Sequence, residues 1–88
     1  MIGEQQMKLT IDTKFNVGDT VYVADYYYDF YTVSKPCVVT EIRIIINSVN
    51  TYVSYIIMDD NNIYITKSEL YLFRSYDECA AYCKSHNC

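Results

Sequence analysis

The side chains that could bind a metal ion gather near the C-terminal end of this sequence. Two cysteines stand one helical turn apart, and a histidine and a further cysteine follow: Cys79, Cys83, His86 and Cys88. Thiolate and imidazole groups are preferred ligands of Zn²⁺. Structural zinc sites usually join distant segments, whereas these four residues are local. They are therefore weak metal candidates, and we expect no metal and no cofactor. We expect Cys79 and Cys83 to be small buried apolar residues. A disulfide is a further alternative.

Acid/base chemistry has one candidate pair, Asp59 and Asp60. Adjacent turn residues point to different sides, so the pair favours a hairpin turn over a catalytic dyad. The single histidine, His86, is near the chain end, and two glycines are too few for a phosphate-binding loop. No nucleophile motif is present. We expect that the protein is not an enzyme.

The richest chemical segment is an aromatic run in a chain with eleven tyrosines and no tryptophan. The candidate partner-binding residues are Asp25, Tyr26, Tyr27, Tyr28, Asp29 and Tyr31. In one interpretation the rings provide contact area and the carboxylates provide charge for a basic partner; a variant is an aromatic cage for a methylated amine. In the other, Tyr26, Tyr28 and Phe30 fold back over an open barrel end while Tyr27, Asp29 and Tyr31 face water. The pattern leaves both open.

The charge balance bears on the class of partner. Eleven acidic residues against seven basic ones give a net charge of −4, and the basic residues are scattered. Because nucleic-acid binding needs clustered positive charge, we expect no direct nucleic-acid binding. The N-terminal segment has no signal-peptide pattern and no apolar run reaches the length of a membrane span. We expect a cytoplasmic protein that contacts no membrane.

The elements that position these residues are mostly strands. Gly18 and Asp19 predict a tight turn that delivers Val21 and Val23 to the core. The segment 24–36 has no clean period and is expected to be a long loop. Residues 37–46 predict a long strand with Val38, Thr40, Ile42, Ile44 and Ile46 on one face. The opposite face, with Cys37, Val39, Glu41, Arg43 and Ile45, is expected to be partly exposed to water. Residues 51–59 and 63–66 predict two further strands joined by a sharp turn.

The last third of the chain predicts a docked helix. Ser75 and Glu78 have the spacing of a capping box, which predicts a helix over residues 76–85. Its docking face is formed by Cys79, Tyr82 and Cys83. The segment 67–73 predicts a helical turn or a short strand that brings Leu70, Leu72 and Phe73 to the core.

The expected fold class is mainly β with one C-terminal helix, arranged as a small open barrel of about five antiparallel strands. Residues 1–13 are expected to form a tail or an edge strand, because Leu9 and Ile11 alternate with polar residues. Residues 14–88 form one small domain in this interpretation.

A resemblance supports this fold. Residues 15–23 follow the pattern Phe-x-Val-Gly-Asp-x-Val-Tyr-Val; a variable loop, three strands, Ser68-Glu69-Leu70 and a capped helix come after it. This arrangement, over residues 14–84, resembles small Src-homology-3-like barrel proteins of phages and mobile elements of Firmicutes-type bacteria. The resemblance implies a non-enzymatic binding role, such as that of inhibitors of host defence nucleases, including anti-CRISPR proteins. The absence of tryptophan and of a proline-recognition pattern argues against polyproline binding.

The leading functional hypothesis is therefore a protein-binding module. It would inhibit a basic, nucleic-acid-binding nuclease of a bacterial host through an acidic, tyrosine-rich surface. The alternative is a housekeeping barrel that binds single-stranded nucleic acid by aromatic stacking. Self-assembly through strand edges is a third hypothesis, and the sequence leaves the oligomeric state open.

Overall fold

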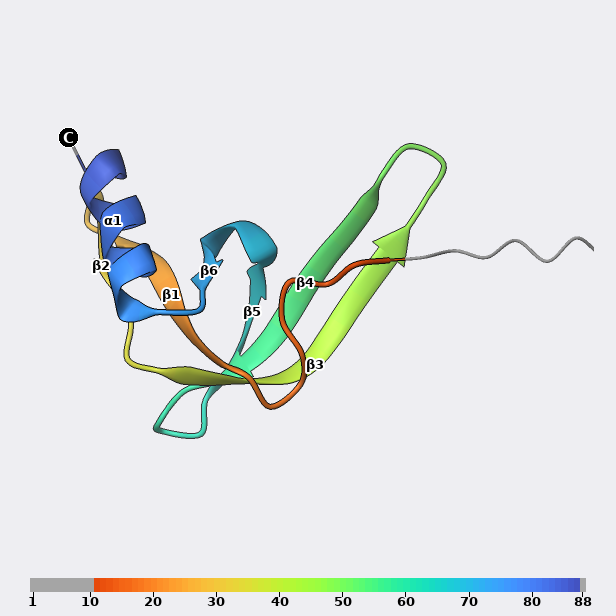
Figure 1. Cartoon of the computed structure of the whole chain (residues 1–88), viewed down its shortest axis with the longest axis horizontal. Coiled ribbons are helices and arrows are strands. Elements are labelled where there is room, and N and C mark those ends of the chain that lie inside the picture. Colours follow the sequence, from red (N-terminus) through yellow and green to blue (C-terminus); the bar gives the residue numbers. More distant parts are fainter. Residues whose placement is uncertain (1–10, 88) are drawn as a thin grey trace, which may run out of the picture.

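The computed structural model describes residues 11–87 of the 88-residue chain. Its elements are β1 (Thr20–Tyr27), β2 (Phe30–Val33), β3 (Cys37–Ile46), β4 (Thr51–Met58), β5 (Tyr64–Ser68), the 3₁₀ turn η1 (Glu69–Tyr71), β6 (Leu72–Phe73) and α1 (Tyr76–His86). The strands follow the order β2-β1-β3-β4-β5, with β6 paired to β1, and every pairing is antiparallel (Figure 1). The expected fold class is confirmed: an open antiparallel sheet with one C-terminal helix. The predicted edge strand around Leu9 lies largely outside the described residues.

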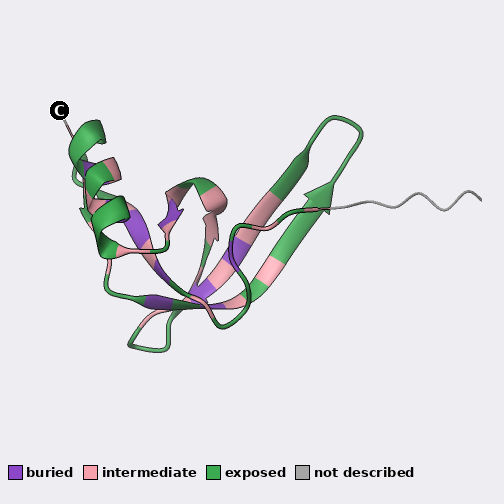
Figure 2. Ribbon diagram, viewed as in Figure 1, coloured by how far each residue is buried: buried purple, intermediate pink, exposed green. Residues whose placement is uncertain are grey.

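The core lies where β1, β3 and β4 meet, and the far ends of β3 and β4 extend away from it into solvent (Figure 2). Its buried members are Phe15, Val21, Val23, Cys37, Val39, Tyr55, Ile57 and Leu72. The expectation that Val21 and Val23 enter the core is confirmed, since both are fully buried. Gly18 adopts a φ of +96°, the left-handed region that glycine enters at little cost, so the predicted turn is also confirmed.

Strand β3 has the predicted bounds, but the predicted faces are wrong for its first residues. Cys37 and Val39 are buried, whereas Val38 is 38% exposed. The pairing with β4 shifts register at Thr40, whose hydroxyl donates to a β4 carbonyl at 3.0 Å. This β-bulge inserts one residue, so that Ile42 packs against the same core as Val39. Simple alternation cannot reveal an inserted residue.

The predicted long loop over residues 24–36 is wrong. Strand β1 continues to Tyr27 and pairs with β2 through a two-residue turn. Both turn residues have positive φ, +50° at Tyr28 and +70° at Asp29, the combination that a type I′ hairpin requires. Tyrosine rarely adopts such a φ, so the sequence carried only a weak turn signal here. The aromatic run is therefore a regular hairpin.

Helix α1 begins at Tyr76 as predicted and ends at His86, one residue later than expected. The Ser75 hydroxyl accepts the Glu78 N–H at 3.2 Å, as the capping pattern predicted. Cys79 and Cys83 pack on Ala24 of β1, which confirms the docking face. Helix α1 therefore covers the β1–β2 hairpin.

The end of the helix is tied to the hairpin by one side chain. The Asn87 amide accepts the backbone N–H of Tyr31 at 2.7 Å and donates to the backbone C=O of Tyr31 at 2.8 Å. These two bonds complete the backbone hydrogen bonding of one β2 residue and hold α1 in place.

The segment 67–73 contains both predicted alternatives, the turn η1 followed by the short strand β6. Leu72 is fully buried and Phe73 is half-buried, as expected. Leu70 is 73% exposed, so its placement in the core was wrong. The 3₁₀ turn rotates Leu70 outward before β6 returns to the core.

Candidate functional site

The tip of the β1–β2 hairpin presents the longest run of exposed rings. Tyr26, Tyr27, Tyr28 and Phe30 are 61%, 64%, 82% and 56% exposed. We refer to these four residues, together with Asp29, as the tyrosine tip. Because three of these rings were the ones expected to fold back over the barrel end, that interpretation is wrong. The rings stand in solvent on a hairpin that the helix supports from one side.

The tip is ordered by ring contacts. Tyr26 lies opposite Tyr31 across the hairpin, with ring centroids 5.0 Å apart. Tyr31 is half-buried and meets the Tyr82 ring of α1 edge-on at 5.5 Å, and Tyr82 in turn stacks on His86 at 3.9 Å. Edge-to-face and stacked pairs add stability beyond their buried area. The exposed rings of the tip therefore stand on a packed aromatic base.

The two predicted carboxylates have different surroundings. Asp29 is exposed at the turn and accepts the Tyr26 hydroxyl at 3.2 Å. Asp25 is half-buried and lies 3.7 Å from the Lys67 ammonium of β5. Asp29 is therefore exposed to solvent, whereas Asp25 has a cationic neighbour.

Beside the tip is a shallow hollow of about 280 Å³, lined by Ala24, Tyr26, Tyr31, Lys67 and Tyr71. Sequence reasoning missed Lys67 and Tyr71. They reach the hollow only because β5 and η1 fold against the hairpin, and no local pattern signals this. Lys67, with Asp25 3.7 Å away, forms part of the wall, so the hollow is not enclosed by rings alone as an aromatic cage for a methylated amine would be.

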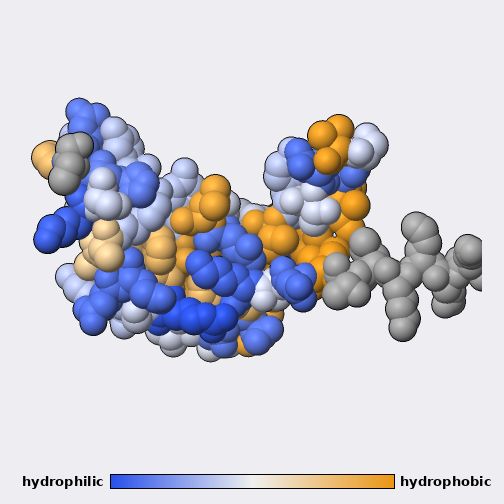
Figure 3. All heavy atoms as spheres, turned by 45° about the horizontal axis from the view of Figure 1, so that its top comes forward, coloured by the Kyte–Doolittle hydropathy of each residue, from blue (hydrophilic) through white to orange (hydrophobic). Residues whose placement is uncertain are grey.

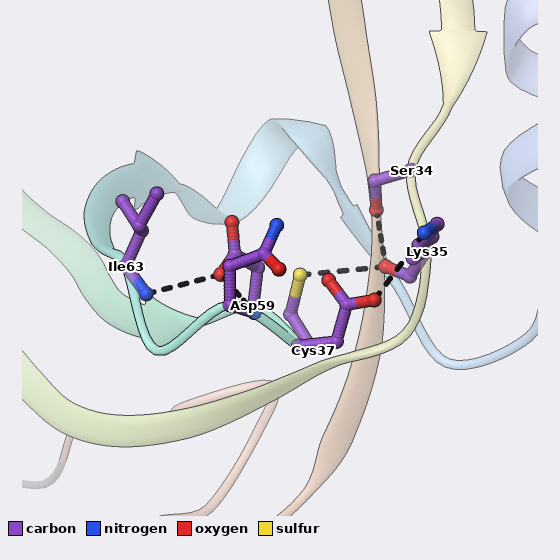
Figure 4. Close-up of polar contacts among 7 residues, drawn as sticks. Ser34, Lys35, Cys37, Asp59 and Ile63 are labelled. Atoms are coloured by element: carbon purple, nitrogen blue, oxygen red, sulfur yellow. Dashed lines mark hydrogen bonds and ion pairs between the residues drawn. The ribbon is translucent and has the colours of Figure 1, made fainter.

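A second concavity, of about 250 Å³, lies between the β4–β5 turn and the approach to β3 (Figure 4). Asp59 accepts the backbone N–H groups of Asn61 and Ile63 at 2.8 and 3.0 Å. Asp60 pairs with Lys35 at 3.3 Å. Asp59 is thus engaged in holding its turn and Asp60 in a surface ion pair, which supports their interpretation as hairpin-turn residues.

The thiol of Cys37 lies in the wall of this concavity. Its Sγ is 3.4 Å from the Lys35 carbonyl oxygen (Figure 4). Burial raises the pKa of Cys37, and the Asp59 carboxylate adds to the rise. Since the thiolate is the reactive form, this environment makes Cys37 a poor nucleophile at neutral pH.

Cys79 and Cys83 do not converge with the histidine. Cys79 and Cys83 are buried free thiols against β1. The His86 ring stacks on Tyr82 instead, with its Nδ1 atom 2.9 Å from the Tyr82 carbonyl oxygen. Cys88 lies outside the described residues. Within residues 11–87 no group of three or more His, Cys, Asp or Glu side chains is arranged to hold a metal ion.

The buried thiol of Cys79 makes the fold sensitive to alkali. Burial, with the neighbouring Cys83 as second cause, raises the pKa of Cys79 from 9.0 to about 12. The unfolded chain releases this proton at lower pH than the native protein does. The stabilisation is therefore complete below about pH 9 and is lost as the pH rises toward 12.

We expect the free energy of unfolding, measured by urea denaturation, to fall between pH 9 and pH 11. The Cys79→Ala variant lacks this thiol and should lose less stability over the same interval, while the ionising tyrosines contribute equally to both proteins. Parallel pH profiles for the two proteins would contradict the assignment to Cys79.

Comparison with protein-family models, with curated proteins and with solved structures finds no match for this chain. In the part of the chain that the structure describes, no helix has the length and apolar character needed to cross a bilayer.

Proposed function

We propose that this protein is a non-enzymatic protein-binding module and that the tyrosine tip is its binding surface. The observation that carries the proposal is the cluster of four rings, each more than half exposed, on one hairpin tip. Tyrosine provides large contact area with little conformational entropy to lose, which is why it is enriched in binding surfaces. The packed base formed by Tyr31 and Tyr82 already orders the hairpin, so less conformational entropy is lost on binding.

The chemistry around the tip favours a basic partner. The chain carries a net charge of −4, and Asp29 presents an exposed carboxylate among the rings. Complementary charge speeds association and selects partners. The resemblance to small barrel proteins of phages and mobile elements supports a specific form of this proposal. The protein would act in the cytoplasm of a bacterial host as an anti-CRISPR-like inhibitor, occupying the basic nucleic-acid channel of a defence nuclease.

One observation favours a second candidate, binding of single-stranded nucleic acid. Exposed rings that stack on bases lie beside Lys67, whose ammonium group could contact a phosphate. Lys67, however, has Asp25 as a neighbour at 3.7 Å. Because phosphate binding depends on clustered positive charge, the protein partner is the better-supported proposal.

The test compares a tip variant with a matched control. The tip variant combines Tyr26→Ser, Tyr27→Thr, Tyr28→Asn and Phe30→Thr, where asparagine tolerates the positive φ of the turn. The control combines Tyr52→Ser and Tyr64→Thr, which remove two rings that are 54% and 62% exposed on other strands.

Each protein is assayed by calorimetry against a purified basic nuclease identified in a pull-down from bacterial lysate. We expect the tip variant to bind at least about 30-fold more weakly, since a ring at an interface hot spot contributes about 2 kcal/mol or more. The control should bind like the original chain. Equal affinity of the original chain and the tip variant would exclude the tip as the binding surface. Salt-sensitive binding of single-stranded oligonucleotides by the original chain would favour the second candidate.

A further inference from the structure

One edge of strand β3 has no backbone partner over its second half among residues 11–87. Near the start of β3, this edge is paired with β1 at Val38. At the next residue, the Val39 C=O accepts the Gly18 N–H at 2.8 Å, and the Val39 N–H donates to the Asp19 C=O at 2.9 Å. Beyond Val39 the pairings of the described residues lie only on the β4 side. The open edge comprises Ile42–Ile46, at the end of β3 that projects away from the core (Figure 1).

The hairpin bonds identify which backbone groups face this edge. The Asn47 N–H donates to the Asn50 C=O at 3.0 Å and closes the β3–β4 hairpin. In an antiparallel ladder, hydrogen-bonded residues alternate with residues whose N–H and C=O point the other way. Counting back from Asn47, the N–H and C=O groups of Ile42, Ile44 and Ile46 point to the open edge.

The side chains from Ile44 to Ile46, at the far end of this edge, are apolar and exposed. Ile44, Ile45 and Ile46 are 40%, 60% and 50% exposed, and hydrophobic atoms cover much of the projecting arm in Figure 3. The one charged residue between Ile42 and Met58 is Arg43, which pairs with Glu41 at 2.9 Å. Proteins usually protect an edge strand with charge, proline or a bulge. The edge from Ile44 to Ile46 carries none of these.

We propose that this edge binds a second copy of the same chain, with the two β3 strands antiparallel about a two-fold axis at Ile44. An edge strand is self-complementary under a two-fold rotation, because each N–H meets a C=O of the other copy. Arg43 is the one charged residue within Ile42–Ile46, so this pairing sets no two like charges directly opposite each other. The four-stranded centre of the dimer is β4-β3 of one copy followed by β3-β4 of the other.

The position of the axis follows from three constraints. An axis at Ile44 places Ile42 opposite Ile46 of the second copy, so all three outward-facing residues of each strand form hydrogen bonds. An axis at Arg43 would set two guanidinium groups directly opposite each other. An axis nearer the start of β3 would bring the second copy against β1, which occupies this edge up to Val39.

A cysteine placed on the axis tests this register. Residues of a hydrogen-bonded antiparallel pair have Cα atoms about 5.5 Å apart, inside the range for a disulfide of about 4.4–6.8 Å. In a Cys88→Ser background, we expect Ile44→Cys to form a covalent dimer under mild oxidation. The matched control, Ile46→Cys, lies opposite Ile42 of the second copy and should remain largely uncrosslinked. Equal crosslinking of both variants, or none of either, would overturn the proposed register.

The dimer itself is tested by sedimentation velocity of the full chain over a range of concentrations. We expect a monomer–dimer equilibrium. Ile44→Lys should raise the dissociation constant of the dimer at least about tenfold, because it sets two ammonium groups opposite each other. Ile44→Val keeps the apolar edge and should behave like the original chain. Thermal unfolding of the monomeric variant checks that it is folded. A chain that stays monomeric up to millimolar concentration, or a dimer that Ile44→Lys leaves intact, would refute the proposal.

Discussion

Replacement of Tyr55 by alanine is expected to lower the free energy of unfolding by about 3–5 kcal/mol, the loss typical of a large buried ring. Tyr55 is fully buried, and the Phe15 ring meets it edge-on at 5.5 Å. A domain of this size has roughly 5–15 kcal/mol of stability in total. We therefore expect a large fall in the urea midpoint at unchanged temperature, measured by circular dichroism.

The hydroxyl of Tyr55 adds a second, separable contribution. It accepts the backbone N–H groups of Lys14 and Phe15 at 3.0 and 3.3 Å and donates to the Glu69 carboxylate. Burial raises the pKa of Tyr55, and the hydrogen bond to Glu69 adds to the rise, so the phenol stays protonated at neutral pH. Tyr55→Phe keeps the ring but removes the hydroxyl that bonds the Lys14 and Phe15 N–H groups and the Glu69 carboxylate. We expect this to lower the free energy of unfolding by about 1–3 kcal/mol.

The matched control for both variants is Tyr64→Ala, which removes a ring that is 62% exposed on the neighbouring strand. This variant should change the free energy of unfolding by no more than about 0.5 kcal/mol. If Tyr55→Ala and Tyr64→Ala had similar unfolding midpoints, the core position of Tyr55 would be wrong. If Tyr55→Phe matched the original chain, the hydroxyl contacts would contribute nothing.

Leu72→Ala is expected to lower the free energy of unfolding by about 2–5 kcal/mol, since it removes a fully buried side chain and leaves a cavity. Leu72 pairs with Val23 and holds β6 against β1. Its loss should therefore also loosen the contact between the sheet and the segment that leads into α1. Differential scanning calorimetry would detect a fall in Tm of about 4–8 °C for each kcal/mol.

Leu70→Ala provides the control within the same short segment. Leu70 is 73% exposed in η1, so its removal should change stability by no more than about 0.5 kcal/mol. The sequence alone placed both leucines in the core. If the two variants lowered the free energy of unfolding equally, the exposed position of Leu70 would be wrong.

The two proposed surfaces belong to different parts of the sheet. The tyrosine tip lies on the β1–β2 hairpin beneath α1, whereas the open edge of β3 lies on the projecting β3–β4 arm (Figure 1). A dimer formed through Ile44 would therefore leave both tyrosine tips accessible. The two tyrosine tips of one dimer would then bind more tightly to a partner with two binding sites, provided that both tips can bind it at the same time.

Local patterns in the sequence determined much of the architecture. Gly18 marks a positive φ, Ser75 caps a helix, and the β-branched run from Cys37 to Ile46 forms a strand with the expected bounds. These features depend on interactions within a few residues, so they are visible in the chain itself. The spacing of Cys79 and Cys83 likewise determined the docking face of α1.

Only the tertiary structure decided the features on which the proposed function rests. The bulge at Thr40 moved the core face of β3, and the positive φ values at Tyr28 and Asp29 turned an expected loop into a hairpin. Lys67 and Tyr71 reached the hairpin through contacts between distant segments. An inserted residue, a strained turn and a non-local contact are each favoured by the packing of the whole chain, which overrides local preference. For this reason the tyrosines were recognisable as candidates from the sequence, but their exposure was not.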